Sequence, residues 1–262
     1  MNYYRIAGAF KYFAFSRHRK GHGIHSPFVF DLINNVLRKD IPPEVLDAIS
    51  GVRKDMAGSS EILKVNDLGA GSQYTSSPHR RLSDISRTST VRNMYGRVLY
   101  NMAMEYNGKN ILELGTSVGI STLFMAMGAS SSKIISIEGC NELAEVAKRN
   151  LARCNIDNTE IIQGDFDTSL NAVRETGFRP SLVFVDGNHR KGPVMRYFSL
   201  LKELITAESV IIFDDINYSV EMNKAWNEIK SDLQVSVSID IFQMGFVFFR
   251  AGMVKQDFVI RY

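Results

Sequence analysis

The chain contains little cysteine and no long apolar run. Its 262 residues include two cysteines, Cys140 and Cys154, which are too few for a disulfide framework and lack the neighbouring Cys or His residues of a zinc site. No stretch approaches the ~20 apolar residues of a membrane-spanning helix. The apolar run Ile6 to Phe15 is followed by basic residues instead of a small-residue cleavage site. We therefore expect a soluble cytoplasmic protein in a reducing compartment.

Low complexity and a strong overall charge are also absent. Hydrophobic residues make up 45% and charged residues 23% of the chain, which is the balance of a globular protein. The net charge is +3, but residues 1–109 contain 16 Lys and Arg against 9 Asp and Glu, whereas residues 110–262 contain 15 against 19. The basic front half is compatible with an anionic substrate, an acidic partner or nucleic acid, and also with an ordinary solvated surface.

The first 90 residues are expected to form a region of helices and loops. Ser26-Pro27 begins a predicted helix that ends near Arg38, and Pro42-Pro43 begins another that continues to about Met56. A third helix is expected over residues 91–106. Residues 69–90 are rich in Ser, Arg and Gly without sustained periodicity, and we expect a long loop there.

From Asn110 onwards, short apolar runs alternate with helical segments. This alternation predicts a parallel sheet with helices on both faces. The predicted strands are residues 111–114, 133–137, 160–163, 182–185 and 210–213. Two further runs, Val235 to Phe242 and Phe246 to Arg250, have hairpin spacing. The expected fold is α/β, a Rossmann-like doubly wound sheet that is mostly parallel with an antiparallel C-terminal hairpin, preceded by a helical N-terminal region.

Two glycine motifs compete for a nucleotide site. Glu113-Leu-Gly115-Thr-Ser-Val-Gly119 lies between a predicted strand and a predicted helix, whose free N–H groups can face a ligand. Asp67-Leu-Gly69-Ala-Gly71 precedes a polar stretch and is assigned to the loop. Ser117 stands where a dinucleotide fingerprint needs glycine, which disfavours a nicotinamide oxidoreductase. Glu138 and Asp165 follow the next two strands, a pattern that suits an adenosine without phosphates.

These motifs in this order resemble a class I S-adenosylmethionine-dependent methyltransferase, and specifically the cation-dependent small-molecule O-methyltransferases. The resemblance covers about residues 91–250 and rests on Tyr95-Gly96-Arg97, residues 111–122, Ile137-Glu138, Gly164-Asp165 and Val185-Asp186. It implies S-adenosylmethionine as the cofactor, a methyltransferase domain over residues 91–262, and a substrate or lid region over residues 1–90.

The resemblance also implies roles for individual residues. Glu113 and Gly115 would shape the pocket for the methionine moiety and Ser121 would meet its carboxylate. Glu138 would bind the ribose, and Asp165 with Phe166 would border the adenine. The full set implied for cofactor binding is Glu113, Gly115, Thr116, Ser117, Gly119, Ser121, Glu138, Gly139, Asp165, Phe166 and Asp186.

Three carboxylates follow the fourth and fifth predicted strands, namely Asp186, Asp214 and Asp215. Because ligands of wound sheets sit beyond the carboxyl ends of the strands, these groups could converge there on a magnesium ion. The resembled enzymes carry Asp-Asn where this chain has Asp214-Asp215. A metal-free arrangement, in which Asp186 holds the amino group of the cofactor, therefore stays open.

His189 stands three residues after Asp186, where the resembled enzymes carry a lysine that acts as a base. Asp186 and His189 are the predicted catalytic residues, because an imidazole can take a proton from a hydroxyl at neutral pH. The alternative is a solvent-facing loop histidine. His18, His22 and His25 also have metal-like spacing, but their basic neighbours favour a solvated segment.

The leading hypothesis is an S-adenosylmethionine-dependent O-methyltransferase acting on a small molecule with a hydroxyl group. The basic front half would suit an anionic acceptor. Nucleic acid is disfavoured because residues 186–189 lack the Asn/Asp-Pro-Pro-aromatic turn that is usual in N-methylation. A non-catalytic nucleoside-binding or partner-binding domain is the alternative, and a homodimer is left open. Trp226 is expected in the core.

Overall fold

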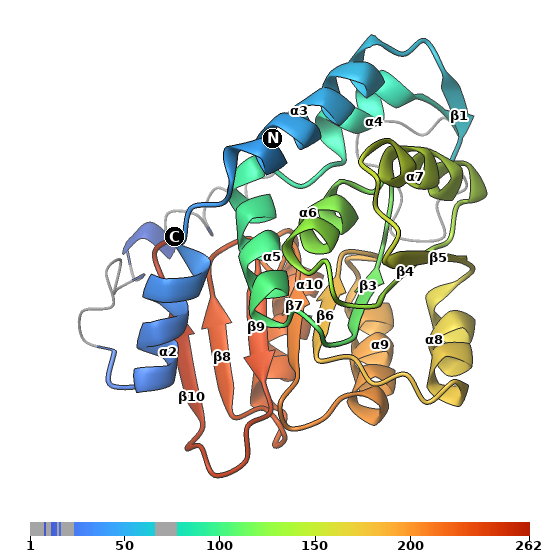
Figure 1. Cartoon of the computed structure of the whole chain (residues 1–262). Helices are drawn as coiled ribbons and strands as arrows, with labels where there is room; N and C mark the ends of the chain where they lie inside the picture. The colour runs from blue at the N-terminus through green and yellow to red at the C-terminus, as the bar shows by residue number, and fades with distance from the viewer. Residues whose placement is uncertain (1–7, 9–11, 15, 17–23, 66–77) are drawn as a thin grey trace.

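An eight-stranded sheet forms the centre of the computed structural model, which describes residues 8, 12–14, 16, 24–65 and 78–262 (Figure 1). In spatial order the strands are β10 (Gln256–Val259), β8 (Val237–Asp240), β9 (Gly245–Phe248), β7 (Val210–Phe213), β6 (Leu182–Val185), β3 (Ile111–Leu114), β4 (Ile134–Glu138) and β5 (Thr159–Gln163). Strand β9 runs antiparallel to β7 and β8, whereas β10 pairs parallel with β8. All strands of this sheet except β9 therefore end at one edge, which we call the carboxyl edge.

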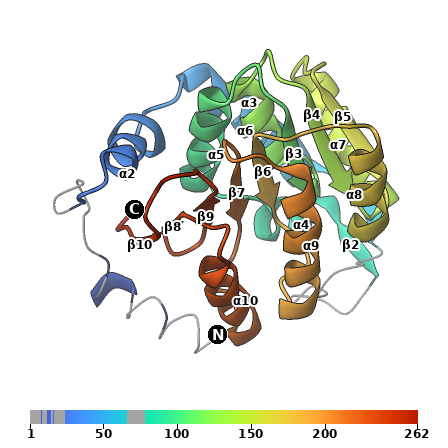
Figure 2. The ribbon, with the colours of Figure 1, turned by 90° about the horizontal axis from the view of Figure 1, so that it is seen from below.

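Helices cover both faces of the sheet (Figure 2). Helices α5 (Asn93–Glu105), α6 (Ile120–Gly128) and α7 (Asn141–Arg153) pack on one face, and α8 (Phe166–Glu175), α9 (Lys191–Leu204) and α10 (Val220–Ser231) pack on the other. Alternate strand residues belong to different faces, so Ile111 is buried in the first core and Leu112 in the second. The predicted doubly wound, mostly parallel architecture is confirmed, and Trp226 is buried as expected.

The N-terminal region contains α2 (Pro27–Asp31), a π-helix η1 (Leu32–Leu37) and α3 (Pro43–Gly58). Ser26 caps α2 by accepting a hydrogen bond from the Val29 amide, and Pro27 opens it. The helices expected here are confirmed. Ile33 and other residues of this region share a buried cluster with the sheet. A domain boundary at residue 90 stays a prediction.

One expectation from the sequence is wrong, and one strand is missing from the prediction. Part of the expected loop over residues 69–90 is ordered as β2 (His79–Arg81), which pairs with β1 (Ile62–Lys64), and as α4 (Leu82–Thr88). Leu82 and Ile85 are buried in the core that also contains residues of α3, so tertiary packing stabilises a helix that its Ser and Thr residues do not favour. The final strand β10 is absent from the predicted elements, because its residues are only partly buried and form no apolar run.

Some predictions fall on residues outside the described ranges. They are the glycine motif of residues 67–71 and the histidines His18 and His22. Of the helices that the structure describes, none has the length and apolar character required to cross a membrane.

The two ends of the described chain are joined beside β10. The Tyr12 hydroxyl donates a hydrogen bond to the carbonyl of Ile260, 248 positions away, and accepts one from the Tyr262 amide at 3.0 Å. Tyr262 in turn donates its hydroxyl proton to the carbonyl of Leu37 at 2.9 Å and stacks on Tyr95. These contacts hold Tyr12 at the carboxyl edge of the sheet.

Candidate active site

A glycine turn connects β3 to α6 at the centre of the carboxyl edge. Gly115 and Gly119 have φ values of +100° and +84°, which disfavour any residue with a side chain. A Cβ atom at Gly115 would lie 1.9 Å from the carbonyl oxygen of Asp186. The ends of β3 and β6 are therefore so close that only glycine fits at this position. Gly119 caps α6 without a side-chain hydrogen bond. The first amides of α6 are therefore available to an anionic group of a ligand.

The Glu113 carboxylate is buried directly beneath this turn. It accepts hydrogen bonds from the hydroxyls of Ser121 and Ser136, both at 2.6 Å, and from Thr122 at 2.5 Å. Burial raises the pKa of Glu113, and the three hydroxyls oppose that rise. The Thr116 hydroxyl shares a hydrogen bond with Ser136. Because Ser121 donates its proton to Glu113, its contact with the carboxylate of a cofactor stays a prediction.

Glu138 ends β4 and faces the same turn. Its Oε2 accepts a hydrogen bond from the Ser117 amide at 2.7 Å, and its Oε1 accepts one from the Cys140 amide at 2.9 Å, which fixes the intervening Gly139. Glu138 thus ties the glycine turn to the end of β4, and its contact with a ribose stays a prediction.

Asp165 and Phe166 lie at the end of β5, where α8 begins. Asp165 caps α8, and its hydrogen bond from the Thr168 amide at 2.8 Å lowers the pKa of this exposed carboxylate. The Phe166 ring fills the space beside Gly187 and meets Tyr197 edge-on, with 5.3 Å between ring centroids. Phe166 is thus packed against the loop that carries Asp186.

The loop after β6 brings Asp186 and His189 together. Nε2 of His189 lies 3.5 Å from Oδ1 of Asp186, and both side chains are partly exposed. The imidazole ring also packs near Tyr218, with 5.6 Å between centroids. Asn188 has φ +51° and donates to the Tyr197 hydroxyl at 3.3 Å, whereas its buried Oδ1 has no partner within the described part of the chain. The loop therefore presents a carboxylate–imidazole pair and a buried acceptor.

The carboxylates at the carboxyl edge perturb one another. Burial, together with the charges of Asp215, Glu113 and Glu138, raises the pKa of Asp186 to about 8. Burial and the charges of Asp186 and Asp215 likewise raise the pKa of Asp214 well above its ordinary value. Among the charges of the described residues that act on these two carboxyl groups, only that of His189 lowers a pKa, namely that of Asp214, so a cationic ligand would be stabilised there.

Asp186, Asp214 and Asp215 supply the oxygen ligands that a hard cation prefers, but they are not arranged to bind one. Across residues 24–65 and 78–262 and the other described positions, no group of three or more His, Cys, Asp or Glu side chains is arranged to hold a metal ion. The conformation thus does not fit a preformed magnesium site on Asp186, Asp214 and Asp215, and we derive no step through a metal. Magnesium binding stays a prediction.

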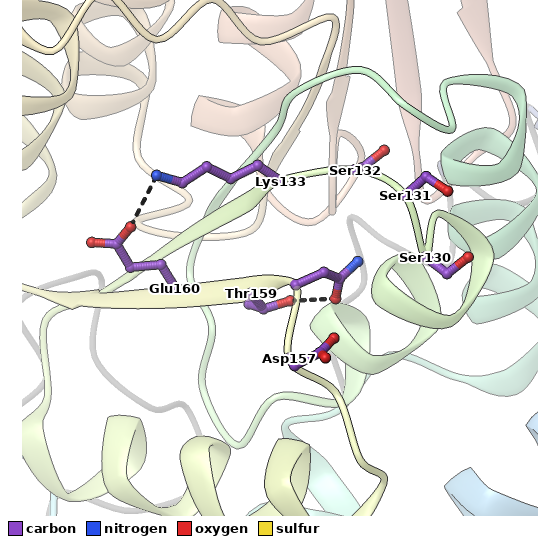
Figure 3. Close-up of a pocket in the computed structure, with 8 residues that line it drawn as sticks. Ser130, Ser131, Ser132, Lys133, Asp157, Thr159 and Glu160 are labelled. Atoms are coloured by element: carbon purple, nitrogen blue, oxygen red, sulfur yellow. Dashed lines mark hydrogen bonds and ion pairs between the residues drawn. The ribbon is translucent and has the colours of Figure 1, made fainter.

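A polar hollow of about 440 Å³ lies at the opposite edge of the sheet (Figure 3). It is lined by residues 130–133, which lead into β4, and by residues 157–160, which lead into β5. Lys133 pairs with Glu160 across it at 3.4 Å, and Asn158 donates to the carbonyl of Ala129. Because the strands begin there, this hollow is separate from the candidate site.

Comparisons with known proteins agree with this geometry. Residues 112–216 match a family model described as a methyltransferase domain. The chain resembles class I S-adenosylmethionine-dependent methyltransferases. The matched segment of this methyltransferase-like chain begins in β3 and ends just beyond β7, so it contains the glycine turn, Glu138, Asp186 and Asp214.

Relatives and solved structures extend this similarity. A catechol O-methyltransferase from Niastella koreensis is 31% identical over 124 residues, which are 46% of this chain and 55% of that protein. One from Mycobacterium tuberculosis is 28% identical over 46% of this chain and 54% of its own length. The chain thus spans about half the length of these relatives. An O-methyltransferase from Bacillus cereus in complex with SAH shares the fold at 20% identity, with a TM-score of 0.56 over 84% of this chain and 97% of that one.

Sequence reasoning missed several residues that the structure places at the site. Asn188 stands beside Asp186 in sequence and could have been noticed there. Tyr218 and Gln243 could not have been predicted. Tyr218 reaches His189 through the turn after β7, and Gln243 reaches Asp214 through the β8–β9 connection. Neither contact has a signal in residue spacing.

Proposed function

We propose that the chain transfers the methyl group of S-adenosylmethionine to a hydroxyl oxygen of a small molecule. The observation that carries this proposal is the arrangement of Gly115, Glu138 and Asp186 at the ends of the adjacent strands β3, β4 and β6. The methyltransferase domain match and the catechol O-methyltransferase relatives support it.

The residues at the carboxyl edge fit this cofactor. The amides of the first turn of α6 suit its carboxylate, and Glu138 suits its ribose hydroxyls. The buried Oδ1 atoms of Asn188 and Asp214 have no donor among the described residues, and an ammonium group or a hydroxyl would satisfy them. When bound, S-adenosylmethionine supplies a methyl group on a positively charged sulfur. The crowded carboxylates favour that charge.

His189 would remove the proton of the acceptor hydroxyl. A neutral imidazole accepts a proton at neutral pH. The Asp186 carboxyl at 3.5 Å would orient it, and would stabilise its charged form once a cationic ligand lowers the raised pKa of Asp186 and ionises it. Removal of this proton leaves a negatively charged oxygen, which is the nucleophile that methyl transfer requires. The protein would otherwise accelerate methyl transfer by positioning, since the glycine turn and Glu138 would fix the cofactor.

The acceptor is proposed to be a small molecule with a hydroxyl on an aromatic ring, because the relatives named above act on catechol. An anionic acceptor would be favoured by the basic front half, in which residues 1–109 hold 16 Lys and Arg against 9 Asp and Glu. A carboxylated catechol such as 3,4-dihydroxybenzoate combines both features and is a suitable probe.

Two measurements test this function. Calorimetry should detect binding of S-adenosylhomocysteine, and mass spectrometry should detect methylated 3,4-dihydroxybenzoate or another hydroxyl compound in the presence of S-adenosylmethionine. His189→Ala should lower turnover about 100-fold or more with little effect on cofactor binding, whereas His79→Ala on the exposed strand β2 should change neither. Cofactor binding without turnover of any hydroxyl compound would favour a non-catalytic binding domain.

A further inference from the structure

The turn between β8 and β9 holds a bulky residue in an unfavourable backbone conformation. Phe242 has φ +75°, a region that large side chains rarely occupy. Its amide donates to Oδ1 of Asp240 at 2.7 Å, and its carbonyl accepts from Asn217 Nδ2 at 2.8 Å. The Ile241 amide closes the turn on the carbonyl of Met244 at 3.0 Å. The surrounding hydrogen bonds therefore impose this conformation.

The Phe242 ring has a specific neighbour. It packs on Tyr12, with 5.1 Å between ring centroids. Glycine would adopt the same backbone without strain, so the shape of the turn alone does not account for an aromatic residue. The contact with Tyr12, which is itself bonded to Ile260 and Tyr262, fixes the turn at the carboxyl edge.

The next residue, Gln243, reaches the candidate site. Its Nε2 donates to Oδ2 of Asp214 at 3.4 Å, and its carbonyl accepts from the Ile216 amide at 3.1 Å. Asp214 is 5% exposed, and its Oδ1 is buried without a partner in the described structure. One oxygen of this carboxyl group is therefore held, and the other is left to a bound molecule.

We propose that Gln243 is a positioning residue, which orients Asp214 so that Oδ1 accepts a hydrogen bond from a hydroxyl of the acceptor. The strained Phe242 turn presents Gln243, and the Tyr12 contact stabilises that turn. The role of Oδ1 rests on the proposed function, because it requires an acceptor. The contact between Gln243 and Asp214 does not depend on it.

The first experiment measures binding and turnover for Gln243→Met, which keeps the length of the side chain but removes the amide donor. We expect the KM for 3,4-dihydroxybenzoate to rise about three- to tenfold, the effect of one weakened hydrogen bond, with a smaller change in kcat. Binding of S-adenosylhomocysteine should stay within about twofold. Gln234→Met, at an exposed position before β8, is the matched control and should change neither value.

The second experiment needs no turnover. A double-mutant cycle combines Gln243→Met with Asp214→Ala and measures the unfolding equilibrium by chemical denaturation. If the two side chains interact, the combined effect should differ from the product of the single effects by at least about twofold. Gln243→Ala replaces Gln243→Met if the latter does not fold.

The outcomes separate the two proposals. Additive effects in the cycle would overturn the positioning role, whatever the protein does. Methylation with an unchanged KM in Gln243→Met would overturn the acceptor role of Oδ1. The same role would be overturned if magnesium alone raised the melting temperature of the wild-type protein but not that of Asp214→Ala. Failure of the wild-type protein to bind S-adenosylhomocysteine would reject the proposed function, and the cycle would still decide the contact.

Discussion

At the scale of single residues, identical carboxyl groups behave differently because their surroundings differ. Asp165 lies exposed at a helix N-terminus, and the Thr168 amide lowers its pKa. Asp186 lies among other carboxylates at the strand ends, where burial and like charge raise its pKa to about 8. The contrast marks the ends of β6 and β7 as the place where a cationic ligand would be stabilised.

Glu138→Gln should weaken cofactor binding. The substitution preserves the shape of the side chain but removes the negative charge, and hydrogen bonds to charged groups contribute about 1.5–3 kcal/mol each. The Kd of S-adenosylhomocysteine should rise at least about tenfold by calorimetry. Glu145→Gln on the exposed side of α7 is the control. If a folded Glu138→Gln variant binds S-adenosylhomocysteine as tightly as wild type, Glu138 does not bind the ribose.

Asp232 should make stability depend on pH. Burial alone would raise its pKa, but hydrogen bonds from Lys202 at 2.7 Å and from the Gln234 amide lower it below the ordinary value. Because the folded-state pKa is depressed, the stabilisation is present above the unfolded pKa of about 3.9 and is lost as the pH falls through the folded value.

Asp232→Asn tests this dependence. At pH 7 the variant should be about 1–2 kcal/mol less stable than wild type, and the difference should shrink towards zero as the pH falls through the depressed pKa of Asp232, because the wild-type carboxyl is then protonated as well. Urea denaturation at several pH values measures both quantities. A difference that does not vary with pH would contradict the assignment.

At the scale of elements, the β3–α6 turn depends on glycine for two separate reasons. Gly115→Ala would place a side chain at φ +100° and 1.9 Å from the Asp186 carbonyl oxygen. Gly177 has φ +76° but no neighbour within 4 Å of a Cβ, so Gly177→Ala isolates the backbone penalty of about 1–2 kcal/mol. Gly115→Ala should cost at least about 3 kcal/mol, measured by denaturant unfolding. Equal losses would show that β3 and β6 are not in close contact.

An element could be predicted from the sequence when its own residues carry a clear pattern. Strands β3, β4, β6 and β7 are mostly apolar runs, buried on both faces, and could be predicted from the sequence alone. Strand β10 could not, because its residues are only partly buried and form no apolar run. Helix α4 could not either, since Leu82 and Ile85 form a short pattern among Ser and Thr residues.

The candidate site shows the same division. Asp186 and His189 are three residues apart on one loop, so their proximity follows from the sequence. Placing Gln243 against Asp214 requires the β8–β9 connection, and no spacing rule supplies that. The left-handed conformation of Phe242 could not be predicted from the sequence either, because glycine or asparagine is the usual signal for it.

At the scale of the whole molecule, ligands that bind only the folded state should raise its stability. S-adenosylhomocysteine at 100 times its Kd should add about 2.7 kcal/mol, or roughly 5–10 °C in Tm for a chain of this size. If Asp186, Asp214 and Asp215 gather around magnesium, that ion should add a further rise, because it relieves their mutual repulsion. Chelation should then abolish turnover without abolishing cofactor binding.

Differential scanning fluorimetry separates these effects. The two ligands are added alone and together, with calcium in place of magnesium as the control, since calcium prefers longer bonds and more oxygen ligands. A shift with S-adenosylhomocysteine and none with magnesium, together with full activity in excess chelator, would contradict magnesium binding by these carboxylates.

The hydrogen bonds of Tyr12 also bear on how the chain folds during synthesis. The partner of Tyr12, Ile260, is made 248 residues after it. At about 5–20 residues per second the interval is roughly 12–50 s. For most of that time Tyr12 has neither β10 nor the Phe242 ring to pack against. The Tyr12 ring therefore stays available to chaperones until the C-terminal strands of the sheet have been made.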